Sequence, residues 1–219
     1  MICELEFEEG EKVFSSCPIG IQLTLGALAV FKSNGGEEMG KIIKILNSGK
    51  VSTAIIRLAN QEDIENNIKN EKEKTEIYKL CREKVKELGI PIKVISTHIQ
   101  FDKSLLKVKF LAKKRIGLKR LMHELAKIYK GRIEFHQIGV RTYAKRFDAF
   151  GVCGKRICCA TFLKEFEPIT IGTIKLQSLS CGTGKLTGVC GRLMCCLAYE
   201  KKHYEEEKKR YEEEKKSNT

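Results

Sequence analysis

The residues best suited to chemistry are cysteines that recur in one repeated frame. "GVCGKRICCATF" begins at Gly151, and "GVCGRLMCCLAY" begins 37 positions later at Gly188. Each copy holds a C-x4-C-C triplet. The six cysteines of the two triplets are Cys153, Cys158, Cys159, Cys190, Cys195 and Cys196. Thiolate sulfur is a preferred ligand of zinc and of iron–sulfur clusters, so the repeat predicts a metal or cluster site.

The spacing suggests how these thiols divide between sites. Neighbouring side chains point in different directions, so adjacent cysteines are not expected to bind one ion in the same way. The first predicted site takes two thiolates from each triplet: Cys153, Cys158, Cys190 and Cys195. The second, shared with a partner chain, takes the remaining pair: Cys159 and Cys196. We expect the pair to point away from the first site.

The kind of metal is less determined than the ligands. The repeats contain no C-x2-C, and His136 and His203 lie outside them, which argues against a common zinc ribbon. Six thiols also exceed the needs of one tetrahedral zinc. An iron–sulfur cluster of the 4Fe–4S type is therefore favoured, with zinc as the alternative.

Other residues in the repeats fit a cluster. The glycines allow sharp turns that aim backbone N–H groups at sulfur; they are Gly151, Gly154, Gly188 and Gly191. Cations in the same turns would offset the negative charge of a cluster; they are Lys155, Arg156 and Arg192. The scattered Cys3, Cys17 and Cys81 are expected to be small buried residues, and Cys181 is an extra thiol.

Composition limits the class of protein. The chain has 219 residues, of which 42% are hydrophobic, which suffices for one large or two small cores. No apolar run reaches the roughly 18 residues that a membrane span requires. The first residues are acidic where a signal peptide would be basic. We therefore expect a cytoplasmic protein, in which clustered cysteines bind metal more often than they form disulfides.

Positive charge is concentrated in one stretch. The net charge is +13, and residues 101–160 alone carry 16 Lys/Arg against 4 Asp/Glu. Such a field attracts polyanions, RNA above all, although a solvated surface near thiolates would have a similar composition. The predicted polyanion or partner contacts are Lys107, Lys109, Lys113, Lys114, Arg115, Lys119, Arg120 and Arg141.

The elements that must position these residues predict an α+β fold of five segments. These are an N-terminal small β-barrel or curled sheet (1–60), a linking helix (61–90), a basic α+β lobe (91–150), the duplicated cysteine-rich segment (151–199) and a charged helical tail (200–219). Together with the linking helix, the lobe forms a two-layer α-β-β-α-β arrangement.

Three local expectations can be tested in the structure. In the strand 105–112, the alternation predicts Lys107 and Lys109 outward. The helix 117–131 is expected to bury an apolar stripe and to end at Gly131; the stripe comprises Leu118, Leu121, Met122, Leu125 and Tyr129. The segment 162–179 is expected to be a loop followed by a strand.

The two cysteine blocks and the F-E-P-I stretch at Phe166–Ile169 resemble those of the bacterial YaaT/RicT family. That family shares the carboxy-terminal domain named after the yeast polymerase-suppressor protein. The resemblance implies a non-enzymatic, cysteine-rich subunit of a cytoplasmic complex with two small helical partners. Such a complex carries iron–sulfur clusters and steers an endoribonuclease in mRNA maturation and turnover, with effects on sporulation, competence and biofilm programmes. It also implies that the six repeat cysteines are the cluster ligands.

Two other functions compete with this expectation. A zinc-stabilised nucleic-acid-binding module would use the same thiols and the same basic stretch. A redox enzyme would need a flavin or nicotinamide site, and we find no Gly-rich dinucleotide loop in the sequence. We therefore expect a binding and regulatory subunit and not an enzyme.

Overall fold

The computed structural model describes residues 2–18, 23–33, 36–46, 50–147, 149–179 and 186–217. The chain divides into two compact units, residues 1–137 and 138–219, a coarser division than the five segments expected from the sequence. The protein is of the α+β class, as expected. Over the described residues, none of the helices is both long enough and apolar enough to cross a bilayer.

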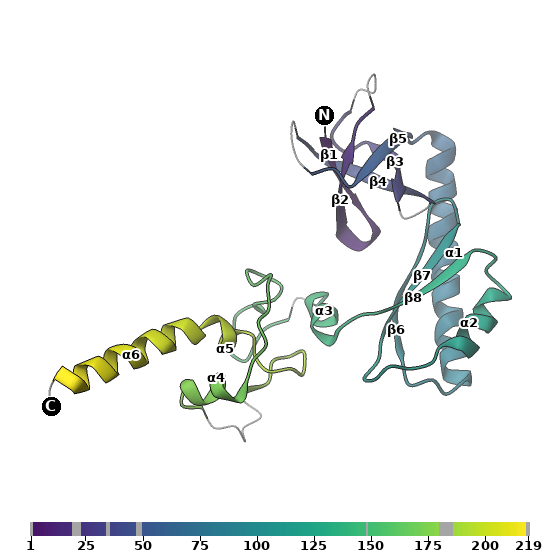
Figure 1. Cartoon of the computed structure of the whole chain (residues 1–219). Helices are drawn as coiled ribbons and strands as arrows, with labels where there is room; N and C mark the ends of the chain where they lie inside the picture. Colours follow the sequence, from purple (N-terminus) through teal and green to yellow (C-terminus); the bar gives the residue numbers. More distant parts are fainter. Residues whose placement is uncertain are drawn as a thin grey trace. The chain divides into compact units, whose positions relative to one another are not determined.

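The first unit begins with a closed β-barrel, where the sequence predicts a barrel or curled sheet (Figure 1). Within the described residues its strands are β1 (Ile2–Phe7), β2 (Glu11–Ser16), β3 (Leu28–Ser33), β4 (Gly36–Leu46) and β5 (Thr53–Leu58). They close in the order β1-β2-β5-β3-β4. β2 pairs with β5 in parallel, whereas the pairings β1–β2, β1–β4, β3–β4 and β3–β5 are antiparallel. Alternating side chains such as Leu5, Phe31 and Ile42 fill the interior.

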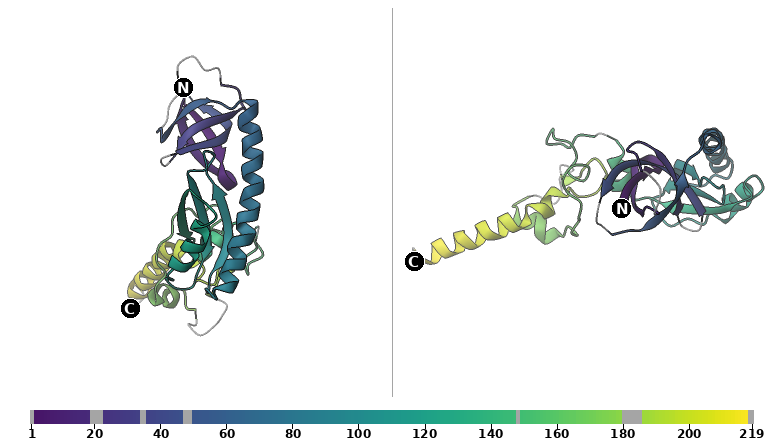
Figure 2. Two further views of the ribbon diagram at one scale, coloured as in Figure 1. Left: turned by 90° about the vertical axis from the view of Figure 1, so that its right-hand side faces the viewer. Right: turned by 90° about the horizontal axis from the view of Figure 1, so that it is seen from above.

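Helix α1 (Gln61–Glu87) follows the barrel and runs alongside both the barrel and the next sheet (Figure 2). A capping box begins it: Asn60 Oδ1 accepts from the Asp63 N–H at 2.8 Å, and Asp63 Oδ2 accepts from the Asn60 N–H at 2.9 Å. Asp63 also pairs with Arg57 at the end of β5. Gly89, at φ +61°, ends the helix in a conformation that suits glycine.

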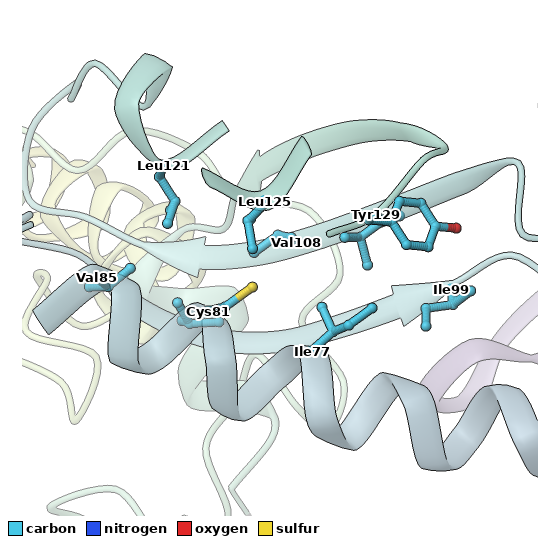
Figure 3. Packing of buried hydrophobic residues seen from close by; sticks show 10 residues of the cluster. Ile77, Cys81, Val85, Ile99, Val108, Leu121, Leu125 and Tyr129 are labelled. Atoms are coloured by element: carbon cyan, nitrogen blue, oxygen red, sulfur yellow. The ribbon is translucent and has the colours of Figure 1, made fainter. Parts of the chain in front are cut away.

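A second sheet has the order β6-β7-β8 and consists of β6 (Lys93–Ile99), β7 (Leu105–Leu111) and β8 (Arg132–Gln137). β6 and β7 are antiparallel, whereas β7 and β8 are parallel and are connected through α2 (Lys119–Ala126). Residues from α1, α2 and the strands form one core; Figure 3 labels Cys81 of α1, Leu125 of α2 and Val108 of β7 among its members. Burial of this face holds both helices on the sheet.

Helix α2 is shorter than the sequence predicts. It ends at Ala126, and Met122 is 43% exposed, so Met122 does not belong to the buried stripe. Gly131 is not the helix cap. A Cβ at Gly131 would lie 2.7 Å from the Lys103 carbonyl oxygen, so a side chain there would collide with the turn that joins β6 and β7.

The expected outward orientation of Lys107 and Lys109 is wrong. Their side chains are only 14% and 16% exposed, because this face of the sheet meets the barrel at the 3-10 helix Glu8–Gly10. Nζ of Lys109 lies 2.7 Å from Oε1 of Glu8, and Nζ of Lys107 lies 3.7 Å from Oε2. Nearby, His98 Nε2 lies 2.6 Å from Oε1 of buried Glu38. Buried charges therefore join the barrel to the sheet.

The second unit consists of short helices and turns followed by a long helix. Its helices are α3 (Val140–Lys145), α4 (Ile171–Leu176), α5 (Cys196–Tyr199) and α6 (Lys201–Ser217). α4 lies where the sequence predicts a strand; Thr170 caps it by accepting from the Thr173 N–H at 3.3 Å. Ile174 packs with Leu186 and Leu197 in the small core of this unit. α6 is polar on all sides and carries ion pairs such as Lys201–Glu205 at 3.7 Å.

Candidate functional site: a cysteine pocket built by a repeat

The two cysteine blocks fold into the same backbone shape. An isolated bridge pairs Phe150 with Arg156, and the matching bridge pairs Thr187 with Leu193. We call residues 150–159 and 187–196 the first and second cysteine turns. Each position of the first turn corresponds to the position 37 residues later in the second.

Backbone hydrogen bonds follow the repeat closely. The Gly151 N–H donates to the Lys155 carbonyl at 2.8 Å, and the Gly188 N–H donates to the Arg192 carbonyl at 2.8 Å. Three more hydrogen bonds from an N–H to a carbonyl recur in the same way. In the first turn they run from Gly154 to Gly151, from Ile157 to Ala149 and from Ala160 to Ile157; in the second they run from Gly191 to Gly188, from Met194 to Leu186 and from Leu197 to Met194. The two cysteine turns therefore share their backbone structure as well as their sequence pattern.

Two glycines make these turns possible. Gly154 has φ +75° and Gly191 has φ +74°, in the left-handed region that favours glycine. A Cβ at either position would meet nothing within 4 Å. The positive φ, and not a lack of room for a side chain, therefore favours glycine directly after Cys153 and Cys190.

All six repeat cysteines line one pocket of about 200 Å³ in the second unit. Its apolar lining includes Val152, Ile157, Val189 and Met194. Cys153 is exposed, and the other five triplet cysteines are half-buried free thiols. Directly after the second turn, Gln177 Nε2 donates a hydrogen bond to the Leu197 carbonyl at 2.7 Å. The repeat thus brings cysteines from both triplets to one pocket.

Both expected sets of thiols are found at the same pocket. Cys159 and Cys196 line it together with the other four repeat cysteines. Which of the six cysteines bind a metal remains a prediction.

The thiols also interact electrostatically. Burial raises the pKa of Cys158, and the neighbouring Cys195 and Cys153 raise it further. Burial and then Cys195 raise the pKa of Cys159, against a lowering effect of Lys145. Burial, followed by Glu200, raises the pKa of Cys196. Neighbouring thiolates repel one another, so each thiol is harder to deprotonate when another has already lost its proton. A bound cation would be needed to stabilise several thiolates in this pocket.

The side chains as they stand do not form a closed metal cage. Among the described residues, no three His, Cys, Asp or Glu side chains converge closely enough to hold a metal ion. The donor set nevertheless fits a thiophilic metal or cluster, because the ligand atoms lining the pocket include sulfur from two matching turns. Cys181 lies outside the described residues.

The positive charge at the pocket differs from the sequence prediction. Arg156 lines the pocket as expected, but Lys155 and Arg192 do not. Arg141 lines it instead, and its guanidinium carbon lies 4.2 Å from the centre of the Phe166 ring. Nζ of Lys145 lies 5.3 Å from the same ring. The sequence signal that would have found this pair is the i,i+4 spacing of Arg141 and Lys145, which places both on one face of α3.

The remaining predicted contacts lie elsewhere. Lys107 and Lys109 are engaged by Glu8 inside the first unit. The others are exposed in the first unit, between β7 and the start of α2; they are Lys113, Lys114, Arg115, Lys119 and Arg120. Cys3 and Cys81 are buried as expected, and burial raises the pKa of Cys81 to about 12, so they are core residues. Cys17 is half-buried in the first unit.

Fold and site together define a two-unit α+β protein whose cysteine-rich pocket is built by an internal repeat. The profile of the PSP1 C-terminal conserved region matches residues 53–138, and that of the third domain of PSP1-like proteins matches residues 168–211. The first match covers β5 to β8, and the second begins after the first cysteine turn and ends within α6.

Comparison with curated proteins identifies the family. The chain is 34% identical over 207 residues to stage 0 sporulation protein YaaT of Bacillus subtilis (strain 168), which covers 92% of this chain and 75% of that protein. The chain therefore belongs to the YaaT-like family of PSP1 proteins, which confirms the family expected from the sequence. A shorter match, 29% over 79 residues, relates 36% of the chain to 10% of the uncharacterized protein PB7E8.02 of Schizosaccharomyces pombe. No solved structure matches.

Proposed function

We propose that this protein is a non-enzymatic regulator whose cysteine pocket carries an iron–sulfur cluster. In this proposal it acts in the cytoplasm as an adaptor subunit that modulates endoribonuclease-dependent maturation and turnover of mRNA. Membership of the YaaT-like family supports a regulatory role, and the name of the Bacillus subtilis relative connects that role with sporulation. The observation that carries the proposal is the convergence of six repeat cysteines on one pocket.

The repeat cysteines supply the ligands in this proposal. The primary set takes two sulfurs from each cysteine turn: Cys153, Cys158, Cys190 and Cys195. Cys159 and Cys196 serve a second site completed by a partner chain. The cluster would supply redox or iron sensitivity, while Arg141 and Arg156 would offset its negative charge from the pocket wall.

The partners would be small helical subunits and an endoribonuclease. The rim of the pocket supports docking there, because Val152 is 73% exposed and Val189 is 57% exposed at the tips of the two cysteine turns. Cys153 is exposed beside Val152. Exposed apolar residues next to an accessible ligand suit a site that another chain completes.

A zinc-stabilised nucleic-acid-binding module is the second candidate. The observation that favours it is the pair of matching turns, since structural zinc sites take paired sulfur ligands from two tight turns. In that case the metal would hold the two turns together and the basic first unit would contact the nucleic acid.

Metal analysis separates the candidates. The full chain is purified anaerobically, and iron, zinc and acid-labile sulfide are measured with the visible absorption spectrum. The proposal expects iron and sulfide in matching amounts with a broad charge-transfer band. About one equivalent of zinc without sulfide would instead establish the zinc module.

Single substitutions test the ligand assignment. Cys153→Ser and Cys190→Ser are each expected to remove the iron and the visible band. Cys17→Ser is the matched control, because Cys17 is half-buried in the other unit; Cys3 and Cys81 are unsuitable because they lie in cores. The assignment is wrong if both pocket variants keep their iron or if the control loses it.

A further inference from the structure

The loop between β7 and α2, together with the first two residues of α2, forms a concentrated basic surface on the first unit. Residues 113–120 read KKRIGLKR, with five cations in eight residues, and all five are exposed. We call residues 113–120 the basic loop. We propose that the basic loop binds the phosphate backbone of RNA. This goes beyond the proposed function, because it assigns direct RNA contact to the unit that lacks the cysteine pocket.

The fold holds the basic loop at both ends. At its start, the Ala112 carbonyl accepts a hydrogen bond from Gln137 Nε2 at 3.1 Å. At its end, Leu118 packs on the core and Leu121 is fully buried. The cations thus belong to a segment fixed on a packed scaffold, which limits the ordering cost when a ligand binds.

The same anchoring explains why the cations face solvent. Leu118, Leu121 and Leu125 turn one face of α2 and its first turn toward the core. Lys119 and Arg120 lie between them along the helix and are exposed. The apolar stripe therefore directs positive charge outward.

The cations of the basic loop have no carboxylate partner among the residues that the structure describes. Carboxylates on the neighbouring helices are already paired: Glu87 lies 2.7 Å from Nζ of Lys84, and Glu124 lies 2.6 Å from Nζ of Lys127. Lys107 and Lys109, on the strand before the loop, are paired with Glu8. The charge of the loop is thus available to an external anion.

The end of the sheet adds to this field. Lys93, the first residue of β6, lies opposite Leu111 at the end of β7, just before the basic loop. Lys93 is exposed as well. Several cations therefore gather at one end of the sheet, as a polyanion requires.

The composition of the loop favours RNA backbone over RNA bases. The basic loop has no aromatic residue on which a base would stack. Lysine and arginine bind phosphate oxygens, arginine with two parallel hydrogen bonds. Binding should therefore depend little on sequence and strongly on salt.

The test measures affinity against salt with the full chain. Fluorescence anisotropy follows binding to a labelled single-stranded RNA of mixed sequence between about 50 and 200 mM salt, a range in which phosphate contacts are sensitive. The loop variant carries Lys113→Gln, Lys114→Gln and Arg115→Gln, which lie outside the core. Three lost phosphate contacts should lower the slope of log K against log salt by about 2 and weaken binding roughly tenfold to hundredfold near 0.1 M salt.

A charge-matched control distinguishes a site from net charge. The control variant removes three cations of the barrel strands, with Lys32→Gln, Lys41→Gln and Lys44→Gln, and should stay close to wild type. The proposal is overturned if the loop variant binds RNA like wild type, or if the control loses as much affinity. It is also overturned if the loop binds poly-glutamate but not RNA, since the partner is then an acidic protein.

The result is separable from the cluster assignment. Iron content is measured on the same preparations, and the loop variant should keep the metal content of wild type. Failure to bind RNA with intact iron rejects only the basic-loop proposal, whereas RNA binding without iron rejects only the cluster.

Discussion

The buried carboxylate of Glu8 offers a direct test of how the barrel is fixed to the sheet. Its side chain is 2% exposed, and its oxygens lie 2.7 Å from Lys109 Nζ, 3.7 Å from Lys107 Nζ and 3.9 Å from His98 Nε2. Glu8→Gln preserves the shape of the side chain and removes its charge. The cations that face Glu8 then lose a buried partner.

The expected cost follows from the environment of the pair. Breaking a buried ion pair by removing one partner costs about 3–5 kcal/mol, mainly because the other charge stays buried without compensation. Lys109 keeps a second partner, Glu11, at 3.0 Å. We therefore expect the lower end, about 3 kcal/mol, or roughly a 10 °C fall in the melting temperature of the first unit.

The control is Glu11→Gln. Glu11 contacts the same lysine, but its side chain is 53% exposed. Exposed pairs contribute at most about 1 kcal/mol. Denaturant unfolding at neutral pH should therefore separate the two variants by about 2 kcal/mol.

The pH dependence gives a second measurement. Burial alone would raise the pKa of Glu8, but His98, Lys109 and Lys107 outweigh burial and hold it below the ordinary value of 4.5. A lowered pKa in the folded state stabilises the fold above pH 4.5, and this contribution is lost as the pH falls through the folded value. The difference between wild type and Glu8→Gln should shrink below pH 4.5. Equal effects of the two substitutions at neutral pH, or a difference that persists in acid, would refute this reasoning.

Two further predictions concern backbone and capping. Gly154→Ala and Gly191→Ala should each destabilise the second unit by about 1–2 kcal/mol, because a positive φ is unfavourable for alanine. Thermal unfolding measures this loss of stability. Gly117, which has no positive φ, is the control, and an effect of the same size for Gly117→Ala would contradict the φ argument. Asp63→Ala should cost about 1–2 kcal/mol, because it removes the capping-box hydrogen bond from the Asn60 N–H and the pair with Arg57, whose hydrogen bond lowers the pKa of Asp63. Hydrogen exchange should rise in the first turn of α1, and unchanged exchange there would argue against capping.

Local patterns predicted the elements of the first unit better than their assembly. The expected N-terminal barrel or curled sheet and the expected linking helix correspond to β1 to β5 and to α1. The closure of the barrel was harder to foresee, because it depends on long-range pairings. β2 and β5, for example, are paired through the short register Ser15–Thr53 and Ser16–Ala54. A short contact of this kind leaves no periodic signal in the sequence.

Tertiary context accounts for the errors. Residues 169–176 read ITIGTIKL, whose β-branched residues favour a strand, yet the Thr170 cap and the burial of Ile174 select α4. Lys107 and Lys109 follow strand alternation correctly, but the face assigned to solvent is covered by the barrel. Local propensity does not report what covers a face.

The repeat in the sequence pointed to residues that lie together in the structure. The six cysteines that it contains line one pocket, and of the four glycines named with them, Gly154 and Gly191 have positive φ. The sequence missed the place of Arg141, because its contact with Phe166 joins residues that are distant along the chain. Matching spacing in the sequence reveals a repeated segment, but it does not reveal which side chains that are distant along the chain pack together.

Because both cysteine turns are on one chain, formation of the thiol pocket does not depend on protein concentration. One turn alone would need a second copy from another molecule, and such a pair would separate on dilution. With both turns on one chain, each meets the other at an effective concentration on the order of millimolar, whatever the abundance of the protein. Assembly of the thiol pocket from Cys153–Cys159 and Cys190–Cys196 is therefore a first-order event. The thiol pocket would therefore form as completely at low protein abundance as at high abundance.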